Sequence, residues 1–253
     1  MLDIIKARIH QGHRTMPWPE GPPPPLPERL AGRPTIAATP CPEDCRKCLA
    51  ICPTGAVGRK ADGVRLDLGK CLFCRACERT CPQHGIRFGA DWRLAAGRRE
   101  ALVVDDEAQG LPARHELAAK LFPRSFKLRQ VSAGGCNACE ADTNVLGTLA
   151  WDLGRFGIQF VASPRHADGL LITGPVTANM RLALEKTWAA VPPPKLVIAV
   201  GACAISGGPY AGHPEQCGGA AAVLPVDLFI PGCPPHPLTI LDGILRLLGR
   251  LGE

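Results

Sequence analysis

The chain has 253 residues, enough for one large or two ordinary domains that each bury a core. Its net charge of +6 is too modest and too little concentrated to indicate nucleic-acid binding, and no stretch offers the ~20 consecutive apolar residues of a membrane span. The 13 cysteines are the informative count. Because no signal peptide is visible at the start, we expect a reducing cytosol, where clustered thiols indicate metal binding.

Residues 1–40 are predicted to be an extended docking arm. The first residues could form a short helix with Leu2, Ile5 and Ile9 on one side. The stretch WPEGPPPPLPERL then forces an extended, polyproline-like path. Such a segment has no core of its own, so we expect it to be disordered or laid across a partner.

Residues 41–90 contain eight cysteines and an internal repeat. The segment CRKCLAICP (45–53) recurs as CRACERTCP (74–82), and each of its cysteines is displaced by 29 positions. Between the two halves, GVRLDLGK alternates apolar and polar residues, which predicts one strand of a hairpin.

The spacing of these cysteines predicts an α+β domain of the dicluster ferredoxin type. The second half has the bacterial ferredoxin run C-x2-C-x2-C-x3-C-P, in which the fourth cysteine ligates the other cluster. The first half has one extra residue, after Cys41, which loosens only that loop. The crossing rule assigns one [4Fe–4S] cluster to Cys41, Cys45, Cys48 and Cys81, and another to Cys71, Cys74, Cys77 and Cys52. Zinc also accepts four cysteines, but the doubled spacing favours iron–sulfur.

Residues 91–123 are predicted to be a connector with a helical portion around RHELAAKLF, and residues 124–253 a second domain. In this domain short apolar strands alternate with amphipathic helices. The strands are FKLRQVS, GIQFVAS, GLLITGP, KLVIAVG and VDLFIPG, and the helices are TNVLGTLAWDLGRF, TANMRLALEKTWAAV and LTILDGILRLLGRL. The alternation predicts an α/β domain with a flavodoxin-like parallel sheet covered on both faces.

Four cysteines that are far apart in the sequence follow three of these strands. In parallel sheets the functional loops lie beyond the carboxyl ends of the strands, so these cysteines are expected to meet at one edge. The third site is therefore predicted to be Cys136, Cys139, Cys203 and Cys233. A third iron–sulfur cluster is favoured, with zinc or ordinary buried thiols as the alternatives.

The remaining polar candidates are given structural roles. Cys217 lies in a polar loop and is left over as a plain thiol. His166 and His236 lie near the cluster loops but are expected to be hydrogen-bonded structural histidines. Asp142 is either a proton-relay acid or a carboxylate favoured by a helix dipole, and the structural role is preferred.

Four stretches, SAGGCNACEADTNVLG, FVASPRHADGLLITGPVT, VIAVGACAISGG and VDLFIPGCPP, resemble the small subunit of membrane-associated [NiFe] hydrogenases. The resemblance is to the formate-hydrogenlyase, or energy-converting (group 4), type and to the homologous 20-kDa-type subunit of respiratory complex I. It covers about residues 124–245, while residues 1–90 resemble the two-cluster ferredoxin subunit of the same complexes. Complex I subunits carry two adjacent cysteines where this sequence has C-x2-C, so the sequence sides with hydrogenase. Relatives often carry glutamate at Asp142, which puts a proton-transfer role there in doubt.

The resemblance implies a natural fusion of two subunits that is an electron-transfer, non-catalytic subunit of an oxidoreductase. Its three [4Fe–4S] clusters would connect a donor subunit with the nickel–iron site of a hydrogenase large subunit, and the third cluster would be proximal to that site. Further iron–sulfur or donor subunits and membrane-arm subunits are implied as partners. The implied location is cytoplasmic, peripheral on the inner face of the cell membrane.

Two alternatives stay open at this point. The first is an electron-transfer subunit of a complex I-like quinone or ferredoxin oxidoreductase that lacks nickel. The second is a zinc-stabilised interaction scaffold without electron transfer.

Overall fold

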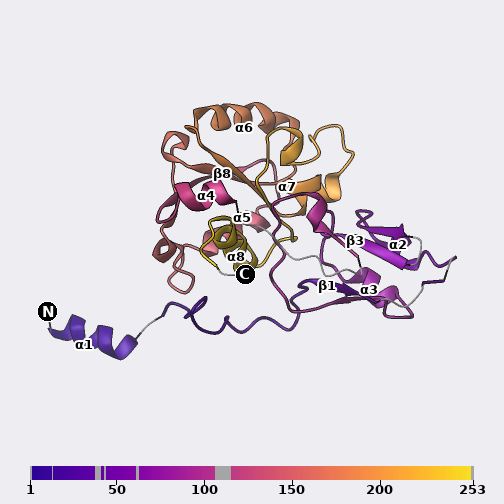
Figure 1. Ribbon diagram of the computed structural model, residues 1–253, viewed down its shortest axis with the longest axis horizontal. Helices are drawn as coiled ribbons and strands as arrows, with labels where there is room; N and C mark the ends of the chain where they lie inside the picture. The colour runs from indigo at the N-terminus through magenta and orange to yellow at the C-terminus, as the bar shows by residue number, and fades with distance from the viewer. Residues whose placement is uncertain are drawn as a thin grey trace.

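The computed structural model describes residues 2–12, 14–37, 41–42, 44–60, 63–105 and 115–251. Its C-terminal half is built on five parallel strands in the order β10-β9-β8-β6-β7 (Figure 1). The strands are β6 (Phe126–Ser132), β7 (Ile158–Phe160), β8 (Gly169–Thr173), β9 (Leu196–Val200) and β10 (Leu228–Ile230). Counted along the chain, this is the order 2-1-3-4-5 of flavodoxin-like domains. The predicted parallel sheet is therefore confirmed, strand by strand.

Helices cover both faces of this sheet. They are α4 (Glu116–Leu121), α5 (Ala138–Val145), α6 (Ala178–Ala190), α7 (Ala202–Ser206) and α8 (Pro237–Leu247), with short 3-10 turns η2 (Leu153–Phe156), η3 (Pro164–His166), η4 (Gly208–Tyr210) and η5 (Ala220–Ala222). Successive strand side chains point to opposite faces. Leu170 and Ile172 of β8 therefore share a core with Leu184 of α6, whereas Leu171 belongs to the core of α8. Figure 1 shows α6 and α8 on opposite sides of the strands.

The helix predicted over residues 143–156 has different bounds. It begins at Ala138, after Asn137 takes a left-handed conformation with φ 69°, and it ends at Val145. The chain then tightens into turns, in which the Gly147 N–H donates to Asn144 O at 3.1 Å. Only the short turn η2 forms further on. The earlier start places Cys139 in the first turn of α5.

The N-terminal unit, residues 34–104, follows the predicted repeat in three dimensions. It contains β1 (Pro34–Ile36), α2 (Lys47–Ile51), β2 (Val57–Lys60), β3 (Gly63–Asp67), α3 (Ala76–Thr80), β4 (Ile86–Phe88), η1 (Glu100–Leu102) and β5 (Val103–Val104). Antiparallel pairs join β1 to β4 and β2 to β3, so a two-stranded pair accompanies each half of the repeat. The hairpin predicted around GVRLDLGK is confirmed.

The two halves of the molecule share one hydrophobic core. Leu66 and Leu102 of the N-terminal unit belong to the same buried cluster as Ile172 and Ala199 of the large sheet. Within the predicted connector, Ala96 pairs with Phe229 on the edge strand β10 through two backbone hydrogen bonds of 2.9 Å. The connector thus closes an edge of the sheet, and β5 extends the hairpin by pairing with β3.

Residues 14–33, called the strap here, lie across the chain's own surface. Met16 N–H donates to Ala150 O at 3.0 Å, and Trp18 is 7% exposed in the core beside α8. At the other end of the strap, Arg75 donates to Leu30 O at 2.7 Å. The arm predicted for residues 1–40 therefore differs from the structure in two respects: its middle packs on its own chain, and residues 34–36 form β1.

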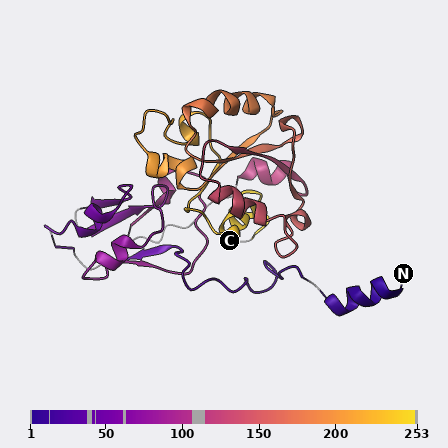
Figure 2. The same cartoon turned by 180° about the vertical axis from the view of Figure 1, so that it is seen from behind.

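The helix α1 (Leu2–Gln11) projects from the body of the molecule (Figures 1 and 2) and has no buried residue. Its apolar side chains Leu2, Ile4 and Ile9 are each more than 70% exposed. Within the described ranges, no helix combines the length and apolarity that crossing a bilayer requires.

Candidate metal centres

The repeat places the N-terminal cysteines on two matching short helices. The helix α2 carries Cys48 and is followed by Cys52 at its C-cap, and α3 carries Cys77 and is followed by Cys81 at its C-cap. The sulfurs of Cys52 and Cys81 make matching hydrogen bonds. The Ala56 N–H donates to the Cys52 sulfur, and the Gly85 N–H donates to the Cys81 sulfur, both at 3.2 Å. The helices α2 and α3 contact each other. Cys48 has Cys81 as a neighbour and Cys77 has Cys52, so each helix contributes one thiol to each of two groups.

The first thiol group gathers around Cys48. Burial raises the pKa of Cys48, and the neighbouring thiols of Cys41, Cys81 and Cys45 raise it further. These four residues are the set that the crossing rule predicts for one cluster. The structure brings them together, and their binding of a cluster stays a prediction.

The second thiol group lines a single pocket. Its four cysteines are Cys52, Cys71, Cys74 and Cys77, and its other walls are mainly apolar. Burial raises the pKa of Cys71 to about 12 and that of Cys77 to about 11, with contributions from the other thiols. The Phe73 N–H donates to the Cys71 sulfur at 3.3 Å. A pocket walled by four thiols and supplied with N–H donors fits a four-iron cluster, whose sulfurs accept such bonds.

The third thiol group lies beyond the carboxyl ends of the parallel strands. Its members are Cys136 and Cys139 after β6, Cys203 in α7 after β9, and Cys233 after β10. Burial is the largest cause that raises the pKa of Cys139, and Glu140 and the other three thiols raise it further. Burial likewise raises the pKa of Cys203 to about 11 and raises that of Cys233. The predicted convergence at one sheet edge is therefore present in the structure.

Glycines make room for these sulfurs. A Cβ at Gly201 would lie 2.5 Å from the Cys139 sulfur, and one at Gly208 would lie 2.8 Å from the Cys203 sulfur. Gly201 also has φ 91° and ψ 155°, a region that essentially only glycine adopts. Glycine is therefore required in these loops by the close approach of backbone to sulfur.

Glu140 is a site residue that the sequence interpretation missed. Glu140 is 5% exposed, and its carboxylate accepts hydrogen bonds of 2.6 Å from Ser132 at the end of β6 and Thr173 at the end of β8. These strands flank the point where the strand order reverses. The sequence signal that could have identified Glu140 is an acidic residue next to a cysteine, together with hydroxyl side chains at the ends of two predicted strands. Asp142, the acid that the sequence interpretation weighed, lines a neighbouring cleft, and burial raises its pKa.

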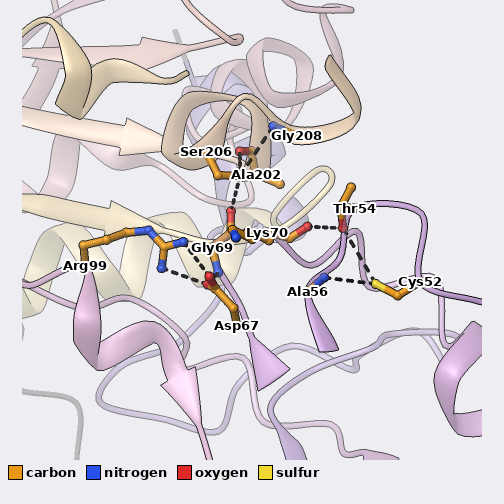
Figure 3. Close-up of polar contacts among 10 residues, drawn as sticks. All are labelled: Cys52, Thr54, Ala56, Asp67, Gly69, Lys70, Arg99, Ala202, Ser206 and Gly208. Atoms are coloured by element: carbon orange, nitrogen blue, oxygen red, sulfur yellow. Dashed lines mark hydrogen bonds and ion pairs between the residues drawn. The ribbon is translucent and has the colours of Figure 1, made fainter. Parts of the chain in front are cut away.

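The second and third groups are neighbours across the interface between the two halves. Burial and the Cys136 thiol raise the pKa of Cys233, and the Cys74 thiol of the second group raises it further. Figure 3 shows the polar contacts that hold the facing loops. Ser206 of α7 donates to Gly69 O at 2.9 Å, and Thr54 donates to Lys70 O at 2.7 Å.

The same loop is braced by an ion pair. Arg99 forms two bonds to the Asp67 carboxylate, at 2.8 and 2.7 Å, and Asp67 also accepts the Gly69 N–H at 2.9 Å (Figure 3). The loop that leads into Cys71 is therefore fixed from both sides, which sets the position of the second group relative to α7 and Cys203.

The other predicted residues lie outside the three groups. Cys217 donates its backbone N–H to Val176 O at 2.9 Å and packs against the shared core. His236 Nδ1 accepts the Leu238 N–H at 3.2 Å as the cap of α8, and burial lowers its pKa. His166 lies exposed at the end of η3. The structural role expected for His236 is therefore supported by its contact.

A single metal ion has no ready-made centre in the described ranges: no three His, Cys, Asp or Glu side chains there converge tightly enough to hold one.

Comparison with known proteins places this chain among subunits of oxidoreductases. The family model described as NADH ubiquinone oxidoreductase, 20 Kd subunit, matches residues 136–247. Formate hydrogenlyase subunit 7 of Escherichia coli is 41% identical over 163 residues, which are 64% of this chain and 62% of that protein. The chain thus spans less than two thirds of that relative.

Two further relatives are covered more fully. The probable membrane-bound hydrogenase subunit mbhJ of Pyrococcus furiosus is 38% identical over 152 residues, 60% of this chain and 91% of that protein. A subunit of the NADH-quinone oxidoreductase of Heliobacterium modesticaldum is 38% identical over 120 residues, 47% of this chain and 69% of that protein. These relatives are subunits of oxidoreductases, as the resemblance implied. The matched region contains all four thiols of the third group, and the chain belongs to the family of the NADH ubiquinone oxidoreductase 20 Kd subunit.

Proposed function

We propose that this chain is the electron-transfer subunit of a membrane-associated [NiFe] hydrogenase complex of the formate-hydrogenlyase type. It would hold three [4Fe–4S] clusters through the twelve cysteines of the three thiol groups, and it would contain no catalytic residue of its own. The observation that carries the proposal is the gathering of these cysteines into three groups of four, the second of which walls one pocket. When bound, each cluster would accept and pass on one electron at a time.

The N-terminal unit is proposed to be a two-cluster ferredoxin domain fused to the family domain. Its support is the strand pair that accompanies each half of the repeat and the crossing of thiols between α2 and α3. The proposed boundaries are those of the sequence, 41–90 for the ferredoxin domain and 124–253 for the small-subunit domain, with 91–123 between them. The structure adds β1 and β5 to the N-terminal unit.

The contacts favour an order for the relay. Cys74 of the second group lies within electrostatic reach of Cys233 of the third, and α2 and α3 link the second group to the first. Electrons from a donor subunit would therefore enter at the first group and leave at the third. There a large subunit carrying the nickel–iron site would dock against the exposed thiol loops of Cys136 and Cys233.

The proposed location is the inner face of the cell membrane, with the chain held there by partner subunits. The hydrogenase relatives support it, because one of them is named as membrane-bound. The second candidate function is a complex I-like oxidoreductase without nickel, which the similarity to the NADH-quinone oxidoreductase relative supports. Hydrogenase is preferred because Cys136 and Cys139 form the C-x2-C pattern.

Hydrogen-driven reduction tests the proposal. The complex of this chain with its large subunit, purified without oxygen, is exposed to H2 and examined by electron paramagnetic resonance. We expect the signals of all three reduced clusters under H2 and none under argon. Signals that appear with dithionite but not with H2, in a complex without nickel, would refute the hydrogenase role and favour the complex I-like alternative.

A further inference from the structure

The two halves of the repeat differ at the loop that begins each cysteine run. In the second half Cys71 and Cys74 are separated by two residues. Cys71 is 6% exposed, and its sulfur accepts a backbone N–H. In the first half Cys41 and Cys45 are separated by three residues, and Cys41 is only half-buried. The longer loop therefore needs another means of holding its sulfur in place.

Arg59, on the neighbouring strand β2, holds the loop between Cys41 and Cys45 in place. Its Nη1 donates to Cys45 O at 2.9 Å and to the Cys41 sulfur at 3.6 Å. Its Nη2 donates to Pro42 O at 3.0 Å and to Cys41 O at 3.3 Å. One guanidinium thus joins both ends of the loop and reaches the thiol itself, which only the planar fork of arginine can do at once.

The repeat shows that this contact belongs to one half alone. The equivalent of β2 is β4, which begins 29 residues later, and the position matching Arg59 is Phe88. Phe88 is buried and lines the pocket of the second thiol group. A cation faces the first group at the place where an aromatic ring faces the second.

We propose that Arg59 is a positioning residue for the first cluster, an inference that rests on the proposed function. It keeps Cys41 in place as a ligand, and its charge and N–H bond to the sulfur raise the reduction potential of that cluster. The sign follows because the reduced cluster carries one more negative charge, which a nearby cation stabilises. Hydrogen bonds to ligand sulfurs act in the same direction.

The test compares three variants of the full-length chain by iron analysis and by a redox titration followed with electron paramagnetic resonance. Arg59→Gln removes the charge and the fork, Arg59→Lys keeps only the charge, and Arg65→Gln is the control. Arg65 lies exposed on β3, with its side chain over Gly58, so its removal takes the same charge from the adjacent strand.

We expect Arg59→Gln to lower the midpoint potential of one cluster signal, the same signal that Cys41→Ser alters. On mild oxidation this variant should also lose about one iron per chain and show a three-iron signal, because the iron held by Cys41 is released. Arg59→Lys should recover part of the potential but still lose the iron, since lysine cannot bridge the loop. Arg65→Gln should match the wild type in both readouts.

Unchanged potentials and iron content in Arg59→Gln would overturn the proposal. If that variant assembles no cluster at all, Arg59→Lys decides: wild-type potential and iron retention in it would show that Arg59 contributes charge alone, which contradicts a positioning role. The proposed function is read from the wild type in the same series. A wild-type chain without three clusters refutes the function, whereas three clusters with no response to Arg59 refute only this inference.

Discussion

Cys139→Ser is expected to remove about four of about twelve iron atoms and to reduce H2-driven electron transfer to near zero. Serine is a poor iron ligand, and the pKa of Cys139 responds to all three other thiols of the third group. The first and second groups draw all of their thiols from residues 41–81, so their eight irons should remain. Iron analysis and electron paramagnetic resonance under H2 and under dithionite measure both effects.

The matched control for this variant is Cys217→Ser. Cys217 lies in the same half of the chain but outside the third group, with its N–H bonded to Val176 O. The Cys217→Ser variant should keep all of its iron and nearly all of its H2-driven electron transfer. Loss of about four irons in the control, or substantial H2-driven reduction in Cys139→Ser, would show that the ligands of the third cluster are assigned wrongly.

Gly201→Ala should abolish the third cluster without touching any cysteine. The added Cβ would lie 2.5 Å from the Cys139 sulfur, closer than real carbon and sulfur atoms approach. The backbone at φ 91° and ψ 155° is also strained for alanine, at a cost of about 1–3 kcal/mol in the free energy of unfolding. We expect a loss of about four irons and a lower denaturation midpoint.

Gly212→Ala separates the two causes. Gly212 has a similarly positive φ of 83°, but a Cβ there meets nothing within 4 Å. This variant should lose about 1 kcal/mol of stability through backbone strain and keep all three clusters. Equal iron contents in the two variants would mean that the Gly201 loop does not hold the sulfur of a cluster ligand.

The sheet and the thiol groups could be predicted because each rests on a local pattern. The strand β6 corresponds to the stretch FKLRQVS, residue for residue. Parallel strands place their carboxyl ends together, so Cys203 and Cys233 could be assigned to one site without knowledge of the loops between them. The repeat allowed the crossing of Cys52 and Cys81 to be predicted in the same way.

Contacts between distant segments could not be predicted. The proline-rich strap has no periodicity that names its partner, and only the structure shows Trp18 buried beside α8. Glu140 was missed because its partners Ser132 and Thr173 end strands that are not consecutive in the sequence. Arg59 is an ordinary strand residue in the sequence, and its role depends on how the hairpin lies against the Cys41 loop.

Metal analysis of the anaerobically purified chain tests the central claim most directly. Three four-iron clusters predict about twelve iron and about twelve acid-labile sulfide per chain, with almost no zinc and absorption that dithionite bleaches. About three zinc ions with little iron would contradict the account and support a zinc-stabilised scaffold. About four irons, with the N-terminal thiols free, would confine the account to the third group.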